Sequence, residues 1–290
     1  MNIAAEQVPG VYRRRLGDVL VTALFDGPLV MPPEVCIGAT PEEQEAIRRA
    51  AGLRPPFAGV INGFMVQWAD RTVLIDAGAG HTMGPTAGRL AGNLRAASVI
   101  LDDVSAILMT HLHLDHAGGL TDAAGTPAFL KAELYLSEAE LAHWTSDDAR
   151  EAAPEVLKSS FELARCQIAP YSTRTRCFTT GKVFSCVQAV PLPGHTPGHT
   201  GYLIESKGEK LLIWGDAMSV PAVQAFRPDV FLVFDTDPQL GISTRRGVLE
   251  RAVTEDLLVA GTHLPFPGFS RVARAGDGFV IQPEPWSLLV

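Results

Sequence analysis

A six-residue segment with the sequence HLHLDH, at positions 111–116, brings together three imidazoles and one carboxylate. The apolar run 104–109 leads directly into it, so the segment lies where a buried strand ends in a loop. Alternate residues of an extended chain face the same side, which lets the first two histidines hold one ion together. The aspartate and the last histidine follow where the chain can turn toward a second ion. Because burying so many titratable groups without an ion would be costly, the segment predicts a metal site with more than one ion.

Three other strand-like runs also end at residues of metal-ligand type. His195 stands in a tight, glycine-rich turn after the apolar run 187–192, and two further apolar runs end at Asp216 and His263. Each run has the same form, a buried strand followed by a small residue and a ligand. Strand ends that converge on one edge of a sheet are where α/β proteins build their sites. These three residues therefore join the first segment as candidate ligands.

The combination of these motifs, which lie between Gly63 and Pro267, resembles that of the metallo-β-lactamase superfamily. The resemblance implies two divalent metal ions, most simply Zn²⁺, although Mn²⁺, Co²⁺ and Fe²⁺ accept the same nitrogen and oxygen ligands. Carried over position by position, it implies a first ion held by His111, His113 and His195, a second held by Asp115, His116 and His263, and Asp216 bridging the two. All seven positions carry the expected residue type, which favours a catalytic member of the superfamily.

The spacing of apolar residues predicts two strand-rich halves. We expect strands at 19–24, 60–68, 73–75, 184–190, 202–205 and 211–214, with a turn at 69–71 between the second and the third. We expect helices at 40–51 and from 137, each after a capping box, and at 84–97, 155–168 and 245–255. The fold class that follows is α+β (α/β), a four-layer αββα sandwich. Residues 1–290 are expected to form one domain, with an N-terminal arm of about residues 1–55 packing on it.

The expected chemistry is hydrolysis. Two divalent ions a few ångströms apart lower the pKa of a shared water, which then exists as a metal-bridging hydroxide at neutral pH. The hydroxide is the expected nucleophile, while the metals polarise a C=O or P=O oxygen. Asp115 is the expected catalytic residue, which orients the hydroxide and later passes a proton to the leaving group. Asp216, a carboxylate on two cations, is expected only to bridge them.

Four further motifs narrow the resemblance to the methyl parathion hydrolase group, namely residues 84–90, 194–200, 222–224 and 263–268. This group implies a homodimer that cleaves phosphotriesters and sometimes lactones or aryl esters. Since phosphotriesters are mainly synthetic, we expect a lactone or an ester as the natural substrate. Quorum-quenching lactonases are related, and hydrolysis of acyl-homoserine lactones is the alternative main activity. They carry a tyrosine three residues after the bridging aspartate, where this chain has Ser219, so their particular mechanism is less favoured.

Substrate pockets of this kind are mostly apolar. The residues expected to line the pocket are Met83, Trp144, Phe161, Phe226, Phe231 and Ser219. Such a lining implies a small, neutral, apolar ester, lactone or phosphotriester as the substrate. Of the remaining histidines, His199 is expected to support the site without binding metal, His81 to lie near its mouth, and His143 to be an ordinary helix-face residue.

Other functional classes fit the sequence less well. Di-iron oxidoreductases on this scaffold replace a histidine of the first motif by glutamate and usually add a flavin domain, and this chain does neither. An iron-dependent persulfide oxidoreductase stays open as an alternative. A nuclease needs a basic face, whereas this chain has a net charge of −8 and a pI near 5.5. Nucleic acid is therefore not an expected partner.

Three features of the sequence bear on the cellular compartment and on contact with a membrane. No apolar run reaches transmembrane length, and the start lacks the charged-then-apolar pattern of a secretory leader. The four cysteines show no CxxC pairing and are expected to be reduced thiols. We therefore expect no membrane contact and a cytoplasmic protein, with an exported form open if a leader precedes this sequence.

Overall fold

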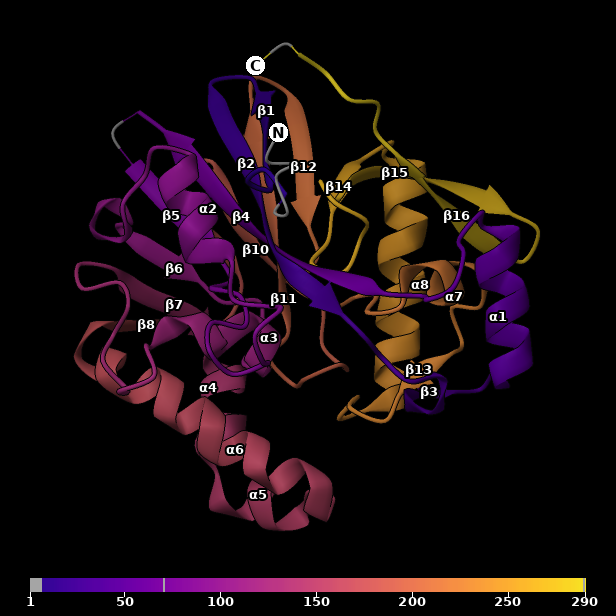
Figure 1. Ribbon diagram of the computed structural model, residues 1–290, viewed down its shortest axis with the longest axis horizontal. Coiled ribbons are helices and arrows are strands. Elements are labelled where there is room, and N and C mark those ends of the chain that lie inside the picture. The colour runs from indigo at the N-terminus through magenta and orange to yellow at the C-terminus, as the bar shows by residue number, and fades with distance from the viewer. Residues whose placement is uncertain (1–6, 70, 289) are drawn as a thin grey trace, which may run out of the picture.

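The computed structural model describes residues 7–69, 71–288 and 290. In this part of the chain, two seven-stranded mixed sheets lie face to face (Figure 1). The strands of the first sheet, in order across it, are β1 (Val11–Leu16), β2 (Val19–Leu29), β4 (Gly59–Trp68), β5 (Arg71–Ile75), β6 (Ala106–Leu108), β7 (Glu133–Ser137) and β8 (Thr175–Phe178). Those of the second are β16 (Gly278–Pro283), β15 (Phe269–Ala275), β14 (Leu258–Ala260), β12 (Glu209–Ile213), β11 (Thr200–Ser206), β10 (Val187–Pro191) and β9 (Gly181–Phe184).

The central strands are buried on both faces, and their side chains alternate between two cores. In β4, Phe64 and Val66 belong to the core between the sheets, whereas Met65 belongs to the core under the outer helices. In β12, Ile213 faces the first of these cores and Leu212 faces a third, on the outer side of the second sheet. Because successive side chains of a strand point in opposite directions, a strand buried on both faces appears in the sequence as an uninterrupted apolar run.

Helices cover the outer face of each sheet. Trp144 and Phe161 pack into the outer core of the first sheet, and Val248 and Leu249 into that of the second. The helices are α1 (Pro41–Ala50), α2 (Leu90–Ala96), α3 (Leu114–Ala117), α4 (Glu138–Thr145), α5 (Asp147–Ala152), α6 (Glu155–Ile168), α7 (Pro221–Phe226) and α8 (Pro238–Thr254). With α2 and α4–α6 on one side and α8 on the other, the predicted αββα sandwich is confirmed (Figure 1).

Helices α1 and α6 agree closely with the prediction. α6 spans Glu155–Ile168, as expected. α1 begins after Thr40, whose Oγ1 accepts a hydrogen bond from Glu43 N at 3.2 Å, while Glu43 Oε2 accepts one from Thr40 N at 2.8 Å. This reciprocal pair is the predicted capping box, which satisfies two backbone donors that the first helical turn leaves unpaired.

The predicted start of α2 at Gly84 is wrong. Residues 80–87 form turns and bends instead, in which Gly84 has a φ of 78°, and the helix begins at Leu90. Asp26 from β2 fixes this beginning, since its Oδ1 accepts from Leu90 N at 2.8 Å and its Oδ2 from Gly88 N at 3.2 Å. Because the capping residue lies far away in the sequence, the residues around 84–90 alone do not show where the helix begins.

The predicted start of α8 at Arg245 is also wrong. The helix begins at Pro238, and Asp237 caps it by accepting a hydrogen bond from Leu240 N at 3.0 Å. Gly241 in the first turns lowers the helix propensity there, which hides the true beginning.

The strand expected at 184–190 is likewise corrected. It is a hairpin of β9 and β10 with a turn at 185–186. In the turn expected at 69–71, position 70 lies outside the described residues.

The early part of the chain contributes to both halves. β1 and β2 form the edge of the first sheet, after which β3 (Cys36–Ile37) pairs with β13 (Phe231–Leu232) and α1 contacts α7 on the other half. Figure 1 shows α1 beside α7, far from α4–α6. Among the described residues, no helix has the length and apolar character that crossing a bilayer requires.

Candidate metal centre

The candidate ligands lie where strands of both sheets end. β6 of the first sheet leads into the HLHLDH segment, while β10, β12 and β14 of the second sheet lead to the other ligands. β12 and β14 are parallel, so their carboxyl ends bring Asp216 and His263 to the same edge. A backbone hydrogen bond from Thr200 N to Thr110 O, 2.9 Å long, joins the two halves beside the ligands.

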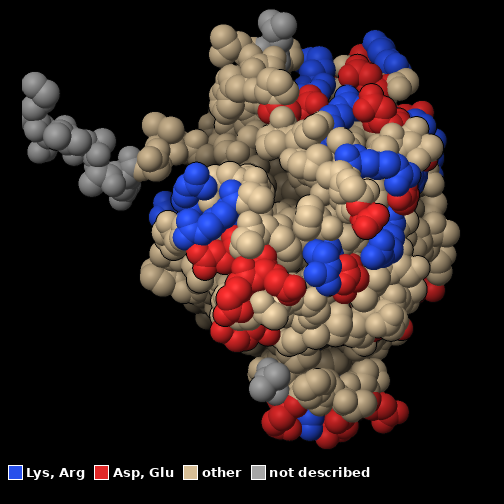
Figure 2. Space-filling model, turned by 90° about the vertical axis from the view of Figure 1, so that its right-hand side faces the viewer, with Lys and Arg blue, Asp and Glu red and all other residues tan. Residues whose placement is uncertain are grey.

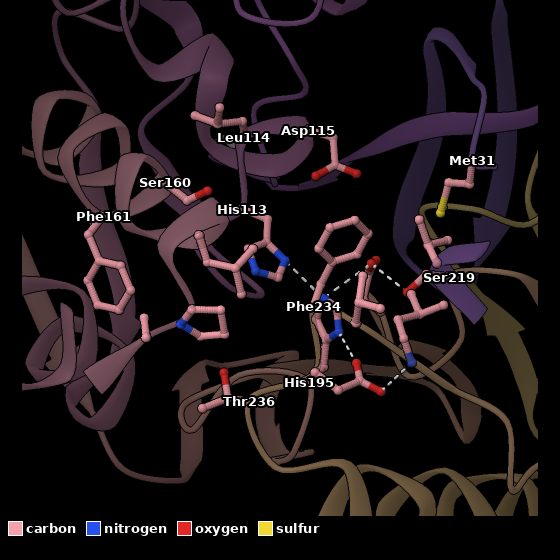
Figure 3. Close-up of a pocket in the computed structure, with 18 of the residues that line it drawn as sticks. Met31, His113, Leu114, Asp115, Ser160, Phe161, His195, Ser219, Phe234 and Thr236 are labelled. Carbon is pink, nitrogen blue, oxygen red and sulfur yellow. Dashed lines mark hydrogen bonds and ion pairs between the residues drawn. The ribbon is translucent and has the colours of Figure 1, made fainter. Parts of the chain in front are cut away.

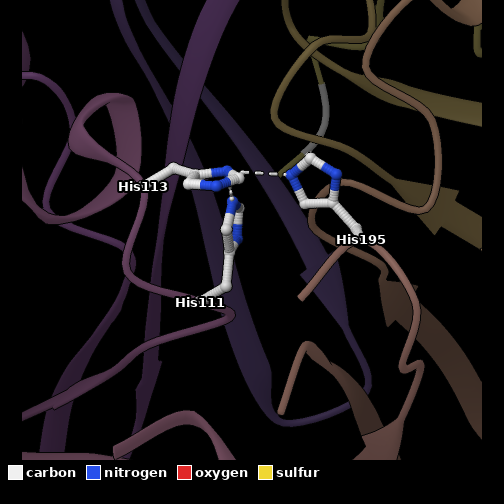
Figure 4. A group of neighbouring side chains, drawn as sticks. All are labelled: His111, His113 and His195. Carbon is white, nitrogen blue, oxygen red and sulfur yellow. Dashed lines mark hydrogen bonds between the residues drawn. The ribbon is translucent and has the colours of Figure 1, made fainter. Parts of the chain in front are cut away.

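The first group of ligands is made of three histidines (Figure 4). The Nδ1 atom of His113 lies 3.0 Å from His111 Nε2 and 3.0 Å from His195 Nε2. Two nitrogens that bind one zinc ion tetrahedrally are about 3.4 Å apart, given Zn–N bonds of about 2.1 Å. The three nitrogens are therefore spaced to hold one ion between them, as the resemblance implies for His111, His113 and His195.

A second group lies directly beside the first. His263 Nε2 is 3.3 Å from Asp115 Oδ2, and His116 Nε2 is 3.6 Å from the same oxygen. Asp216 lies between the groups: its Oδ1 is 3.1 Å from His116 Nε2, while its Oδ2 is 3.1 Å from His263 Nε2 and 3.5 Å from His195 Nε2. The structure thus brings all seven predicted ligands together, with Asp216 where a bridging carboxylate would lie.

Two orphaned atoms test whether the site fits a metal. His116 Nε2 and Asp216 Oδ1 are buried and lie 3.1 Å apart, but neither makes a hydrogen bond of good geometry to a described residue. Leaving a buried polar atom unpaired is costly, and native proteins rarely do so. Divalent cations at this place would satisfy both atoms, so the donor set fits metal ions.

Two aspartates that the sequence analysis did not assign orient the histidines from outside. Asp76 Oδ2 accepts a hydrogen bond from His116 Nδ1 at 2.7 Å, and Asp235 Oδ1 accepts one from His195 Nδ1 at 2.7 Å. Each bond holds the Nδ1 proton and directs Nε2 toward the centre, where the nitrogen can bind a cation once its own proton has left. The role of Asp76 could have been predicted from its position directly after β5, at the same sheet edge as the HLHLDH segment.

His263 and His199 are held by backbone groups. His263 Nδ1 lies 2.8 Å from Val60 O, which turns Nε2 toward the centre. His199 Nδ1 lies 2.8 Å from Leu192 O, and its Nε2 accepts a hydrogen bond from Asp216 N at 2.9 Å. His199 thus fixes the backbone of Asp216 and belongs to neither ligand group.

Glu140, in the first turn of α4, joins the loops of both ligand groups. The predicted capping box at Ser137 is wrong, because Ser137 caps α4 through Ala139 N while the Glu140 side chain points into the protein. Its carboxylate is buried and accepts hydrogen bonds from Leu112 N (2.9 Å), Trp144 Nε1 (2.6 Å), Thr196 Oγ1 (2.6 Å) and Gly198 N (3.1 Å). One carboxylate therefore ties the HLHLDH segment to the turn that carries His195.

The charges of the two groups differ. Burial lowers the pKa of His113 to about 3, with the charge of His195 acting in the same direction. Burial also lowers the pKa of His263, but Asp216 and Asp115 outweigh it and raise that pKa to about 10. Burial raises the pKa of Asp115, but His116 and His263 outweigh it and lower that pKa to about 2. Without a cation, the second group pairs carboxylates with imidazolium, so a metal ion must displace protons there.

A cavity of about 720 Å³ opens on the ligands (Figure 3). His113, Asp115, His195, Asp216 and His263 form its polar wall. The rest of the lining is mainly apolar and comes from the 29–35 segment, α5, α6 and residues 232–236. The size and the mostly apolar lining are typical of a small-molecule site.

Four of the six expected lining residues face this cavity, and two do not. Met83, Trp144, Phe161 and Ser219 line it. Phe226 lies outside it, at the end of α7 beside β16, and is half exposed. Phe231 lies outside it as well, because it pairs with Ile37 in the β13–β3 ladder.

Other residues take the place of these two phenylalanines. Phe234, Met31 and Leu157 line the cavity although they are far from the ligands in sequence, and His143 lines it too. His81 lies on an exposed turn and is not part of the lining. At the polar wall, Ser219 Oγ donates a hydrogen bond to Asp216 Oδ2 at 2.9 Å.

Comparison with known proteins identifies the family. Residues 57–263, more than half of the chain, match the Metallo-beta-lactamase superfamily, and the chain belongs to it. Together with the cluster of histidine and aspartate ligands, this makes the protein a metal-dependent hydrolase that binds divalent metal.

Three relatives are similar over much of the chain. The uncharacterized protein YobT of Bacillus subtilis (strain 168) is 29% identical over 161 residues, which are 55% of this chain and 63% of that protein, so the match spans less than two thirds of the relative. The hydrolase AbOPH of the beta lactamase superfamily matches with a TM-score of 0.91 at 29% identity, over 97% of this chain and 100% of that one. AidC, a dizinc quorum-quenching lactonase in complex with the product N-hexnoyl-L-homoserine, matches with a TM-score of 0.91 at 23% identity, over 97% of this chain and 100% of that one. At this identity, the likeness to AidC shows the fold alone.

Proposed function

We propose that the protein hydrolyses carboxylic esters or lactones that carry an apolar group. The observation that supports this most is the large apolar cavity whose polar wall is made of the metal ligands themselves. A carbonyl placed at the ligands leaves its apolar group among Phe161, Phe234 and Met31. The lactonase AidC, which has a similar fold, binds an acylated homoserine product, in keeping with a lactone or ester substrate.

The roles of the ligand side chains follow from their exposure. When bound, two divalent ions lower the pKa of a water molecule and withdraw electrons from the carbonyl oxygen of the substrate. The Asp115 side chain is 16% exposed and faces the cavity, whereas that of Asp216 is 4% exposed. Asp115 is therefore the carboxylate that can orient the attacking water, hold its proton on the oxygen that is not used as a ligand, and deliver it to the leaving oxygen. Asp216 is held by Ser219 and His199 and would serve as a ligand to both ions.

The decisive experiment is metal analysis of the purified protein followed by a hydrolysis panel. The panel contains an acyl-homoserine lactone, an aryl ester, a paraoxon-type phosphotriester and a β-lactam. Turnover of the lactone or the aryl ester, lost after chelation and restored by metal, is the expected result. A protein with two bound metals that cleaves neither of them contradicts the proposal.

Phosphotriester cleavage is a second candidate activity on the same site. It is favoured by Ser219, which stands where the related lactonases carry a tyrosine and whose hydroxyl donates its hydrogen bond to Asp216. A site that polarises C=O also polarises P=O, so we expect comparable efficiency on the aryl ester and the phosphotriester.

The remaining expectations are part of the same proposal. We propose Zn²⁺ as the metal. The alternative is an iron-dependent persulfide oxidoreductase, and measuring the metal content and the oxygen uptake with a persulfide distinguishes the two. We also propose a homodimer, and that residues 1–290 act as one domain, since the ligands come from both halves of the chain. The cysteines Cys36, Cys166, Cys177 and Cys186 are unpaired, and a cytoplasmic location stays a prediction.

A further inference from the structure

A second cavity, of about 220 Å³, adjoins the metal centre at the ligand His263. Leu29, Met31, Ser219 and His263 line both cavities, so the two meet at the metal centre. The large cavity leads from there to α5 and α6, whereas the small one leads to α1, residues 53–58 and the beginning of α7. A substrate held at the ligands can therefore extend into both.

The small cavity contains a buried arginine without a carboxylate partner. Arg48 is 6% exposed, and its partners in the described part of the chain are Gln44, whose Oε1 accepts from Nη2 at 3.4 Å, and the ring of Phe57, whose centroid lies 5.4 Å away. Gln44 cannot turn away, because its Nε2 donates to Pro33 O and Ala39 O at 2.9 and 3.1 Å. The guanidinium is thus held in place with most of its donors unused.

Comparison with Arg245 shows how unusual this is. Arg245 is 2% exposed, but it donates to the carbonyl oxygens of Ala217, Pro228 and Val230 and lies 3.8 Å from Asp235 Oδ2. A buried cation normally has such partners, because losing hydration without them costs several kcal/mol. Arg48 has neither carbonyl nor carboxylate partners. It faces a cavity instead.

The rest of the lining is also suited to an anion. Arg54 lines the same cavity, and no aspartate or glutamate is among the described lining residues. This charge does not belong to a broad basic surface, because basic and acidic side chains lie next to one another on the face that carries α1 (Figure 2). The positive charge is therefore local to the small cavity.

We infer that the small cavity is a subsite for a carboxylate group of the substrate, bound by Arg48. This rests on the proposed function and narrows its substrate class to esters or lactones with an apolar group on one side of the scissile bond and a negatively charged group on the other. Hydrolysis adds one water across the ester C–O bond and yields a carboxylate, an alcohol and a proton. The group at Arg48 is unchanged by the reaction.

The test compares two substrates that differ in one charge. The first is mono-4-nitrophenyl adipate, which keeps a free carboxylate, and the second is methyl 4-nitrophenyl adipate, in which a methyl ester replaces that carboxylate. After spontaneous hydrolysis is subtracted, we expect the metal-loaded enzyme to prefer the acidic ester in kcat/KM by about tenfold, mostly through KM, since hydrogen bonds to charged groups are of this strength. The preference should shrink as ionic strength rises.

Three variants separate the role of Arg48 from folding. Arg48→Met should abolish the preference, and Arg48→Lys should keep part of it. Arg49→Met is the matched control and should keep the whole preference, because Arg49 is the next residue of α1, pairs with Glu45 at 2.7 Å and lines neither cavity.

The two proposals fail in different ways. Hydrolysis of the diester without preference for the acid, or a preference that Arg48→Met retains, overturns the subsite and leaves the proposed function standing. No hydrolysis of either ester by the two-metal protein counts against the proposed function. In that case, calorimetry with monomethyl adipate decides the subsite: binding that Arg48→Met abolishes supports it, and equal or absent binding overturns it. If Arg48→Met does not fold, Arg48→Lys and the salt dependence of the unmodified enzyme decide.

Discussion

Asp115 is the residue in which metal binding and proton transfer are most easily separated. Its Oδ2 lies 3.3 Å from His263 Nε2 and faces the cavity. In Asp115→Asn, the amide oxygen still serves as a ligand, but the side chain no longer accepts a proton. We expect two metals per chain and a fall in kcat of about 10²- to 10⁴-fold, measured by metal analysis and aryl ester hydrolysis. Full turnover with two metals bound would refute the role of Asp115.

The raised pKa of His263 predicts proton release on metal binding. A histidine of pKa about 10 is protonated at pH 8, whereas an ordinary histidine is not, and only the neutral ring binds a cation. Zinc uptake at pH 8 should therefore release this proton, and affinity for the second ion should rise with pH up to about 10. In the metal-free protein, the raised pKa stabilises the fold below pH 6.5, and this contribution is lost as the pH rises toward 10.

Calorimetry in two buffers of different protonation enthalpy measures this release. His263→Gln, which removes the titrating group, is the control and should release about one proton fewer per chain. Equal proton release from the two proteins would show that His263 is already neutral before zinc binds.

At the scale of elements, α4 supports the centre through Glu140. Its carboxylate accepts hydrogen bonds from Leu112 N and Gly198 N, in the loops of the two halves. Glu140→Gln replaces one acceptor oxygen by an amide that faces these donors, at a cost of about 2–3 kcal/mol in the free energy of unfolding. Because the loops carry ligands, we also expect weaker metal binding and a lower kcat. Metal titration, thermal melting and kinetics measure the three effects.

Glu138→Gln is the matched control for Glu140→Gln. Glu138 lies in the same first turn of α4 but is exposed to solvent. The Glu138→Gln variant should have the melting temperature and the metal affinity of the unmodified protein. Weakened metal binding of equal size in both variants would assign the effect to α4 as a whole and not to the buried carboxylate.

The wrong start of α2 and the wrong capping box at Ser137 have a common physical cause. Apolar periodicity located several of the buried strands and α6, because burial of a strand or of one helix face leaves a local pattern, but it missed others such as β7 and β15. The start of α2 depends on Asp26, and the orientation of Glu140 depends on donors in two other loops. Contacts of this kind join residues far apart in the sequence, and no local pattern reports them. The ligand motifs were predictable since each follows its own strand, whereas Phe234 and Arg48 reach the site only through the fold.

At the scale of the whole molecule, the metal ions would join the two halves of the sandwich. The HLHLDH segment follows the first sheet, while His195, Asp216 and His263 follow strands of the second. Beside the ligands, Tyr202 Oη donates to Met109 O at 2.6 Å, so one direct link between the halves does not depend on metal. Removing the metal should therefore loosen the junction at the ligand loops without separating the sheets, whose shared core remains.

This predicts a metal-dependent melting temperature. Metal present at a thousand times its dissociation constant stabilises the folded state by about 4 kcal/mol, or about 7 °C for a protein of this size. Chelation should lower the melting temperature by that amount, and added zinc should restore it. Hydrogen exchange should rise in the HLHLDH segment and in the turn of His195, but not in β4 or β12. In Asp216→Ala, which lacks the carboxylate between the two ligand groups, chelation should lower the melting temperature by less. An unchanged melting temperature after complete chelation would mean that bound metal adds nothing to the stability of the folded state, and it would contradict the role of the ions in joining the two halves.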